Sequence, residues 1–268
     1  VIKIEAPEIG DDSRKFGPFI EDYSAYFMSL NRGKESIALN LKNADDKKIF
    51  EKILSKADIL VENFKPGTLE KWGYGWKDVN KKYPKLIYAS ASGFGQTGPL
   101  KELPAYDMVV QGMGGLMSVT GQPNSEPTRV GTSIGDITAG LFTAIGINAA
   151  LYDRQKTGKG MFIDVSMLDC QIAILENAIA RYLAKNEIPK PMGSRHPSIA
   201  PFEAFKTKDS HIIIAAGNDK LFEKLCNLLE MPEISKNQKF SDNSSRAKNM
   251  DELKKILENK LLSKQTNE

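Results

Sequence analysis

The sequence contains few of the residues from which metal centres, disulfide scaffolds and hydrolytic triads are built. Its 268 residues include two cysteines and two histidines. Cys170 and Cys226 lie in apolar helical patterns without CxxC spacing, which argues against a zinc site or a disulfide framework and favours a reducing compartment. HExxH spacing and a Ser-His-Asp order are both missing. Metalloenzyme and serine-hydrolase interpretations are therefore disfavoured, and we expect no bound metal.

A large charge of one sign and a long apolar run are missing as well. The 37 basic and 34 acidic residues give a net charge of +3, which does not indicate a nucleic-acid partner but allows basic patches for a phosphorylated small molecule. No apolar run approaches 18 residues, and the given residues contain no stretch of the kind found at the centre of a secretory signal. We therefore expect no membrane contact and a soluble chain, cytoplasmic or, in a eukaryote, in the mitochondrial matrix.

The sequence does contain strand patterns that alternate with helix patterns. Strands are predicted at residues 1–5, 36–41, 59–61, 86–90 and 161–165, and helices at 44–56, 105–118, 137–154 and 167–185. This alternation predicts an α/β fold with a parallel sheet and helices on both faces. A proline-marked connection, a hairpin pattern at 202–216 and a helix at 220–229 follow. We predict a large α/β domain at residues 1–190 and a smaller α+β domain at 191–268.

One carboxylate stands at the mouth of the longest predicted helix. Asp136 follows Gly135 and precedes the apolar periodicity that starts at Ile137, which is the position of a helix N-cap. The positive end of a helix would keep this carboxylate ionised. Beside a residue without a side chain, it would be open to attack an acyl carbon and form a mixed anhydride. These residues alone do not separate a cap from a nucleophile.

Ligands of open α/β sheets bind at the carboxyl ends of the strands, where the loops 6–18, 62–67 and 92–99 are expected. Asn63, Phe64 and Lys65 offer an amide, an aromatic face and a cation, which suit a nucleotide or a pantetheine arm. The glycine-rich loop 92–99 matches neither the P-loop nor the GxGxxG fingerprint. The basic residues that could meet phosphates are Arg32, Lys42, Lys65 and Lys71.

Several segments, in this order along essentially the whole chain, resemble the family III (CaiB/BaiF type) CoA-transferases. They are VIKIE at 1–5, NRGKESI at 31–37, AD at 57–58, VENFKPG at 61–67, GFGQTGP at 93–99, YD at 106–107, GD at 135–136 and KTGKG at 156–160. Within this family, GSRHPSIAP at 193–201 followed by FKTKD at 205–209 resembles the branch that moves CoA among small dicarboxylic acids, including the succinyl-CoA:glutarate type.

The resemblance implies that Asp136 is the nucleophile, with backbone N–H groups near Gly135 supporting the oxyanion. It implies acyl-CoA and a small carboxylic acid as substrates, no permanently bound cofactor, and an interlocked homodimer with a Rossmann-like large domain. It also implies that an N-terminal strand and helix and a C-terminal segment are missing from this chain. The implied CoA contacts are Leu39, Asn40, Leu41, Lys42, Asn63, Phe64, Lys65, Lys71, Pro104, Ala105, Tyr106 and Asp107.

Two other functions remain as alternatives. Racemases of the same superfamily place a His before the acidic residue at 107, where this chain has Tyr106, so a 2-methylacyl-CoA racemase is disfavoured. A non-catalytic CoA-binding subunit is the second alternative. Arg195 and His196 are candidates for holding the distal carboxylate of a diacid, although a structural role for Arg195 is equally compatible. The sequence does not identify the donor and acceptor acids.

Overall fold

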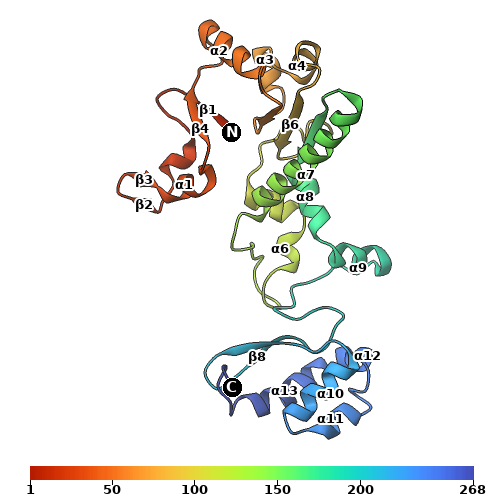
Figure 1. Cartoon of the computed structure of the whole chain (residues 1–268). Coiled ribbons are helices and arrows are strands. Elements are labelled where there is room, and N and C mark those ends of the chain that lie inside the picture. The colour runs from red at the N-terminus through yellow and green to blue at the C-terminus, as the bar shows by residue number, and fades with distance from the viewer. The chain divides into compact units, whose positions relative to one another are not determined.

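The computed structural model describes all residues from 1 to 268 (Figure 1), and contacts between residues divide the chain into two compact units. The first unit comprises residues 1–110 and 133–171, and the second comprises residues 111–132 and 172–268. The predicted domain boundary between residues 190 and 191 stays a prediction.

The first unit contains the predicted parallel strands, but they form two sheets. β1 (Ile2–Glu5) pairs with β4 (Glu35–Ala38), and β6 (Ile87–Ser92) lies between β5 (Ile59–Glu62) and β7 (Phe162–Ser166). All these pairs are parallel, as predicted. The prediction of one parallel sheet is wrong, because neither β1 nor β4 pairs with β5, β6 or β7. The two sheets are joined by the side chains that pack between them in one core. That core includes Ile4, Ile37, Leu39, Leu60 and Tyr88.

Short helices close this core. α2 (Ala44–Leu54) begins as the sequence predicts, with the Asn43 side chain accepting from the N–H groups of Asp45 and Asp46. Phe50 and Leu54 on its inner face are buried. Two shorter helices follow along the chain, α3 (Thr68–Trp72) and α4 (Trp76–Lys82). In Figure 1 the long helix α7 (Ile134–Thr157) lies along β6 and β7, which it contacts.

Two predicted helices are interrupted. In place of the helix at 105–118 there are α5 (Asp107–Met113) and α6 (Leu116–Val119), because Gly115 between them has a φ of +87°. The helix expected at 167–185 is divided into α8 (Met167–Ile174) and α9 (Asn177–Lys185) at Glu176, whose φ is +44°. Apolar periodicity continues through both breaks, so the sequence pattern does not reveal them.

One side of α7 is apolar and exposed to solvent. The side chains of Ile137, Leu141, Phe142, Ile145 and Tyr152 are all exposed in this chain. Contrary to the expectation from apolar runs, this helix is long and apolar enough to cross a membrane by length and composition. A single helix that passes this test is weak support for a membrane span, and an apolar surface of this kind also suits a protein partner.

The loop after β1 is held to the sheet by a buried carboxylate. Glu5 accepts two hydrogen bonds from Arg14, one from Ser36 and one from the backbone N–H of Asp11. These contacts, Arg14 foremost, lower the pKa of Glu5 to about 2. The segment that follows contains η1 (Asp12–Lys15), β2 (Phe19–Ile20), β3 (Tyr23–Ser24) and α1 (Ala25–Asn31).

We expect Glu5→Gln to lower stability at neutral pH and to flatten its acid dependence. A carboxylate with a lowered folded-state pKa stabilises the fold above the unfolded pKa of about 4.3, and this contribution is lost as the pH falls toward the folded value of about 2. Thermal unfolding between pH 7 and pH 2 measures the difference. The exposed Glu8→Gln serves as the control, and equal melting curves for the two variants would contradict the assignment.

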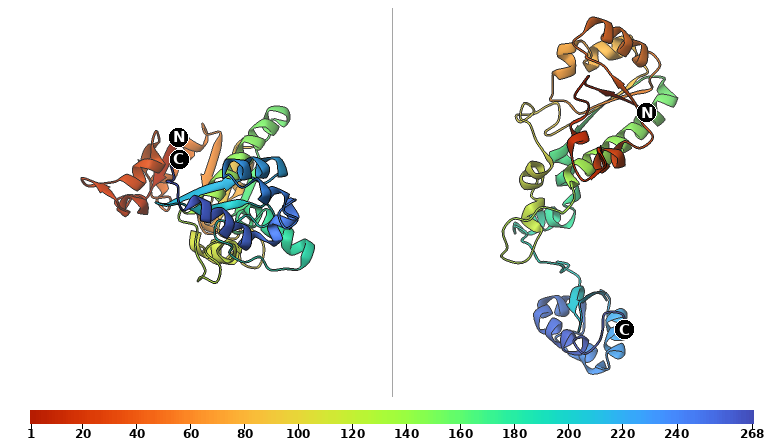
Figure 2. Two further views of the ribbon diagram at one scale, coloured as in Figure 1. Left: turned by 90° about the horizontal axis from the view of Figure 1, so that it is seen from below. Right: turned by 90° about the vertical axis from the view of Figure 1, so that its left-hand side faces the viewer.

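The second unit has its own core in its C-terminal part. β8 (Phe202–Lys206) and β9 (His211–Ala215) form the predicted antiparallel hairpin. Four helices surround it, α10 (Asp219–Leu228), α11 (Pro232–Lys236), α12 (Asn243–Lys248) and α13 (Met250–Leu261). Figure 2 shows these helices in blue, gathered beside the hairpin. Phe205, Phe222, Phe240 and Leu257 are completely or almost completely buried at the centre.

Candidate functional site

Asp136 lies inside the first turn of α7 rather than at its cap. The helix starts at Ile134, its N-cap is Ser133, and the N–H of Ile137 donates to the carbonyl oxygen of Ser133 at 2.9 Å. The predicted N-cap at Asp136 is therefore wrong, because residues 134 and 135 already have helical geometry. The carboxylate is still within the first turn, near the positive end of the helix.

Gly135 is required for close packing. Its N–H donates to Oδ1 of Asp107 at 2.8 Å, and an added Cβ would lie 2.7 Å from Cγ2 of Val110 and 3.0 Å from that same Oδ1. The start of α5 thus approaches the first turn of α7 where a side chain is missing. Because Asp107 already accepts the N–H of Gly135, the oxyanion would need other backbone N–H groups near Gly135, and its support there stays a prediction.

We expect Gly135→Ala to destabilise the protein by about 1–3 kcal/mol, the usual cost of overpacking a buried contact. Gly140→Ala on the same helix is the matched control, because a Cβ there meets nothing within 4 Å. In that open position alanine stabilises a helix by up to about 1 kcal/mol relative to glycine. Urea unfolding of both variants provides the measurement, and equal free energies of unfolding would contradict the packing argument.

Protein surrounds the Asp136 carboxylate on part of its surface, although the residue is exposed. This desolvation, and secondarily the nearby Asp107, raises the pKa of Asp136 above its ordinary value. The sequence-based expectation that Asp136 is ionised stays a prediction. The ionised form is the nucleophile, and a raised pKa makes this form more nucleophilic. As the pH falls, Asp136 also becomes protonated, and thus inactive, at a higher pH than an ordinary aspartate does.

The residues proposed to contact CoA all lie in the first unit, and most of them lie in loops that follow its strands, whereas Lys71 lies on α3 and Asp107 begins α5. After β4, the Leu39 side chain is buried in the core, so only its backbone can face a ligand, whereas Asn40 and Lys42 are exposed. Asn40 accepts from the N–H of Lys42 at 3.0 Å, and its own N–H donates to Asp46. Leu41 packs partly against the core.

The loop after β5 carries the next group. Asn63 donates to the carbonyl oxygen of Ala91 at 2.7 Å, and the exposed Phe64 ring packs edge-on against Trp72. Lys65 lies 3.6 Å from Glu102 in an exposed ion pair, and Lys71 is exposed on α3. Both lysines therefore remain accessible to a phosphate group.

Residues 104–107 adjoin the loop after β6. Ala105 packs against Gly93, where an added Cβ would lie 2.4 Å from the Ala105 Cβ. Pro104 is exposed, as is Tyr106 with 79% of its surface accessible, while Asp107 is buried. The structure thus brings Asn63 and residues 104–107 to neighbouring positions around the end of β6, and Asp107 links them to Gly135.

Arg195 and His196 lie in the second unit and have different surroundings. The guanidinium of Arg195 donates to Glu203 and to Asp251, each at 2.8 Å. Nδ1 of His196 accepts from the N–H groups of Ser198 and Ile199, so the ring proton resides on Nε2, which has no acceptor in the chain. Of the two, His196 has the free donor, and Arg195 is engaged in an ion-pair cluster.

Sequence reasoning missed a polar row across the second sheet. Glu62, Ser90 and Asp164 occupy matching register positions on β5, β6 and β7, and Gln96 contacts two of them. The only sequence signal is a polar residue inside an otherwise apolar strand. No group of three or more His, Cys, Asp or Glu side chains is placed to hold a metal ion.

Known proteins resemble this chain along its whole length. An acetyl-CoA:oxalate CoA-transferase of Acetobacter aceti is 49% identical over 98% of the chain, and a human succinyl-CoA:glutarate CoA-transferase is 42% identical over 96%. The chain spans 68% of the first relative and 59% of the second.

Solved structures are also similar to this chain along almost its whole length. A CaiB/BaiF family protein from Brucella suis superposes with a TM-score of 0.85 at 40% identity, covering 99% of this chain and 71% of that one. A hypothetical protein of Mycobacterium tuberculosis gives a TM-score of 0.88 at 31% identity, with the same coverage. The sequence pattern of CoA-transferase family III matches residues 1–268. On these grounds, the chain belongs to CoA-transferase family III.

Proposed function

We propose that the full-length protein transfers CoA from an acyl-CoA donor, with succinyl-CoA as the first candidate, to a small carboxylic or dicarboxylic acid. The observation that carries this proposal is Asp136, an accessible carboxylate with a raised pKa in a chain of this family. Its oxygen attacks the thioester carbon, and the C–S bond breaks to give an aspartyl anhydride and CoA thiolate. The thiolate then attacks the Asp136 carbonyl, which releases the donor acid and leaves an aspartyl-CoA thioester.

The acceptor repeats this chemistry in reverse. Its carboxylate attacks the aspartyl-CoA thioester, CoA leaves, and the thiolate finally attacks the acyl carbon of the new anhydride. Asp136 is regenerated and the acceptor departs as its CoA thioester. The CoA moiety would lie along Leu39–Lys42, Asn63–Lys65, Lys71 and residues 104–107 of the first unit. No resident cofactor takes part in this scheme.

The acceptor class follows from the relatives and from His196. The names of the two curated relatives given above each contain a dicarboxylate, oxalate in one and glutarate in the other. A diacid needs a donor for its distal carboxylate, and the unpaired Nε2–H of His196 supplies one. Arg195 supports this loop through Glu203 and Asp251.

We also propose a homodimer in the cytoplasm or in a mitochondrial matrix. The dimer is supported by the exposed apolar side of α7, which a second copy of the chain would cover. Light scattering of the full-length protein and of Leu141→Glu tests this. The wild-type protein should be a dimer and the variant a monomer, whereas a monomeric wild-type protein would contradict the proposal.

The transfer assay uses the full-length protein with succinyl-CoA or acetyl-CoA and, separately, oxalate, glutarate and acetate. Mass spectrometry of the products should show a new diacid thioester with at least one donor. Retained binding of CoA in calorimetry without exchange for any pair would support a binding subunit instead. Deuterium entering the α-carbon of a 2-methylacyl-CoA would support a racemase.

For the acceptor site, we expect His196→Ala to raise KM for a diacid acceptor about tenfold, which corresponds to the loss of one hydrogen bond to a charged group. The KM for acetate, which lacks the second carboxylate, should not change. His211→Ala, at the exposed start of β9, is the control. An equal effect of His196→Ala on both acceptors would exclude distal-carboxylate binding.

A further inference from the structure

Three polar side chains form a row across the sheet of β5, β6 and β7. In the register of these parallel strands, Glu62 lies opposite Ser90, and Ser90 lies opposite Asp164. Residues at matching positions of neighbouring strands point to the same face of a sheet. Ser90 is completely buried, and its hydroxyl donates a short hydrogen bond to Glu62. The row therefore crosses the sheet next to the loops that follow the carboxyl ends of β5 and β6.

Gln96 connects this row to the glycine-rich loop 93–99. Its side-chain Nε2 donates to the hydroxyl of Ser90 at 2.7 Å, and its backbone N–H donates to both carboxylate oxygens of Asp164 at 3.0 Å. Ser90 thus donates to Glu62 while it accepts from Gln96. One residue of a glycine-rich loop is thereby fixed to two strands, to β6 by its side chain and to β7 by its backbone N–H.

Glu62 connects the same row to the loop that follows β5. Its second oxygen accepts from the N–H of Phe64 at 2.8 Å, and the neighbouring Asn63 is fixed to β6 through the carbonyl oxygen of Ala91. A continuous chain of hydrogen bonds therefore runs from Phe64 through Glu62 and Ser90 to Gln96. It ends on β7 at Asp164.

A row of buried polar side chains is less stable than apolar residues would be at the same strand positions. Burial raises the pKa of Glu62 in spite of the hydrogen bonds from Ser90 and Phe64, so its carboxylate is held where the charged form is disfavoured. An apolar residue at such a strand position would avoid this cost. The arrangement instead fixes two otherwise separate loops relative to each other, and glycine-rich loops have much conformational freedom to lose.

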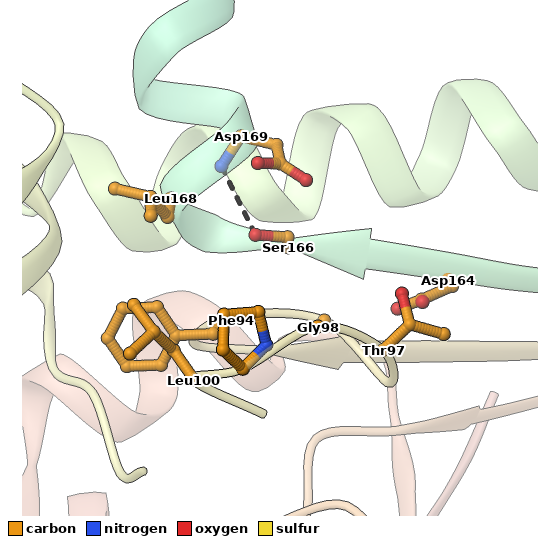
Figure 3. A pocket seen from close by; sticks show the side chains of 10 residues that line it. Phe94, Thr97, Gly98, Leu100, Asp164, Ser166, Leu168 and Asp169 are labelled. Carbon is orange, nitrogen blue, oxygen red and sulfur yellow. Dashed lines mark hydrogen bonds between the residues drawn. The ribbon is translucent and has the colours of Figure 1, made fainter. Parts of the chain in front are cut away.

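Loop 93–99 also borders open space. It forms one wall of a pocket of about 320 Å³, and Asp164, Ser166 and Asp169 stand on the opposite wall (Figure 3). In Figure 3, Thr97 of the loop lies beside Asp164. A shift of this loop would therefore change the shape of the pocket, and through the hydrogen bonds of Gln96 it would also affect the loop that contains Asn63.

We propose that Gln96 is a positioning residue that, through Ser90 and Glu62, holds the loop of Asn63, Phe64 and Lys65 in the conformation that receives the CoA moiety. The role in CoA binding rests on the proposed function, whereas the coupling between the two loops does not. Gln96 itself need not touch the substrate. Its loss is predicted to act on the affinity for the thioester rather than on the chemical step.

The first test is amide hydrogen exchange in the full-length protein without substrate. Gln96→Ala should accelerate exchange at residues 63–65 and at 94–98 by about fivefold or more, with an unchanged melting temperature. Ser90→Ala should accelerate the same amides, and the double variant should add little to either single change, because all three interrupt one chain of contacts. The exposed Gln238→Ala in the second unit is the control.

The second readout is kinetic. Gln96→Ala should raise KM for the acyl-CoA about tenfold while kcat changes less than twofold. Gln96→Glu cannot donate to Ser90 and adds a carboxylate near Glu62, so it should not restore either readout. Wild-type exchange at residues 63–65 in Gln96→Ala would overturn the coupling. Accelerated exchange with an unchanged KM would overturn the role in CoA binding, whereas an inactive wild-type protein would refute the proposed function alone.

Discussion

Replacing Asp136 by Asn in the full-length protein is expected to lower kcat for CoA transfer by at least about 10³-fold, because an amide oxygen does not replace a carboxylate as the attacking nucleophile. The side chain keeps nearly the same volume at an exposed position in the first turn of α7. Loss of the negative charge removes its repulsion with Asp107, which contributes to the raised pKa of Asp136. The fold should therefore be retained, and steady-state kinetics together with a melting curve measure both effects.

Asp153→Asn near the other end of α7 is the matched control. Asp153 accepts a local hydrogen bond from Thr157 and lies far along the helix from residue 136. It should retain transfer within about twofold, since it takes no part in the proposed chemistry. If Asp136→Asn retained comparable activity, the covalent mechanism would be refuted.

Replacing Arg246 by Ala is expected to destabilise the second unit by about 3–5 kcal/mol, the cost of removing a buried charged side chain whose three nitrogens are each hydrogen-bonded. Arg246 is completely buried. It donates to the carbonyl oxygens of Ala200 and Phe240 at 2.7 and 3.1 Å and to Asp219 at 2.8 Å. The guanidinium also lies 4.6 Å from the ring centroid of Phe222. Truncation would leave two carbonyl groups without partners beside a cavity.

The measurement is urea unfolding followed by circular dichroism, supported by hydrogen exchange in β8 and in helices α10 to α13. Lys255→Ala on the exposed side of α13 is the control and should change stability by less than about 0.5 kcal/mol. Equal unfolding midpoints for the two variants would show that Arg246 does not hold this core together.

The sequence predicts the elements of this fold better than their connections. The start of α2 is correctly predicted because apolar residues, Phe50 and Leu54 among them, recur at helical spacing, and its end is predicted two residues too late. The start of α7 is wrong by three residues, since a cap at Ser133 and a cap at Asp136 are equally compatible with the residue types. Periodicity also cannot show that the parallel strands form two sheets, because an apolar strand signals burial but not its neighbour.

For the site, individual residues are predictable and their partners are not. Asp136 stands out because a carboxylate follows a glycine at the start of a helix. The contact between Asp107 and Gly135, however, joins residues that are 28 positions apart, and no local pattern encodes it. The same holds for Ser90 with Glu62 and for Arg195 with Asp251. Long-range polar contacts depend on the tertiary register, which a single sequence does not specify.

The measurement that tests the central claim most directly is mass spectrometry of the full-length protein after treatment with succinyl-CoA and then hydroxylamine. An aspartyl anhydride or thioester reacts with hydroxylamine at the side-chain carbonyl, so the peptide that contains Asp136 should carry a hydroxamate. The Asp136→Asn variant should carry none. Protein that exchanges CoA rapidly while Asp136 stays unmodified, or a hydroxamate at another carboxylate, would contradict the account.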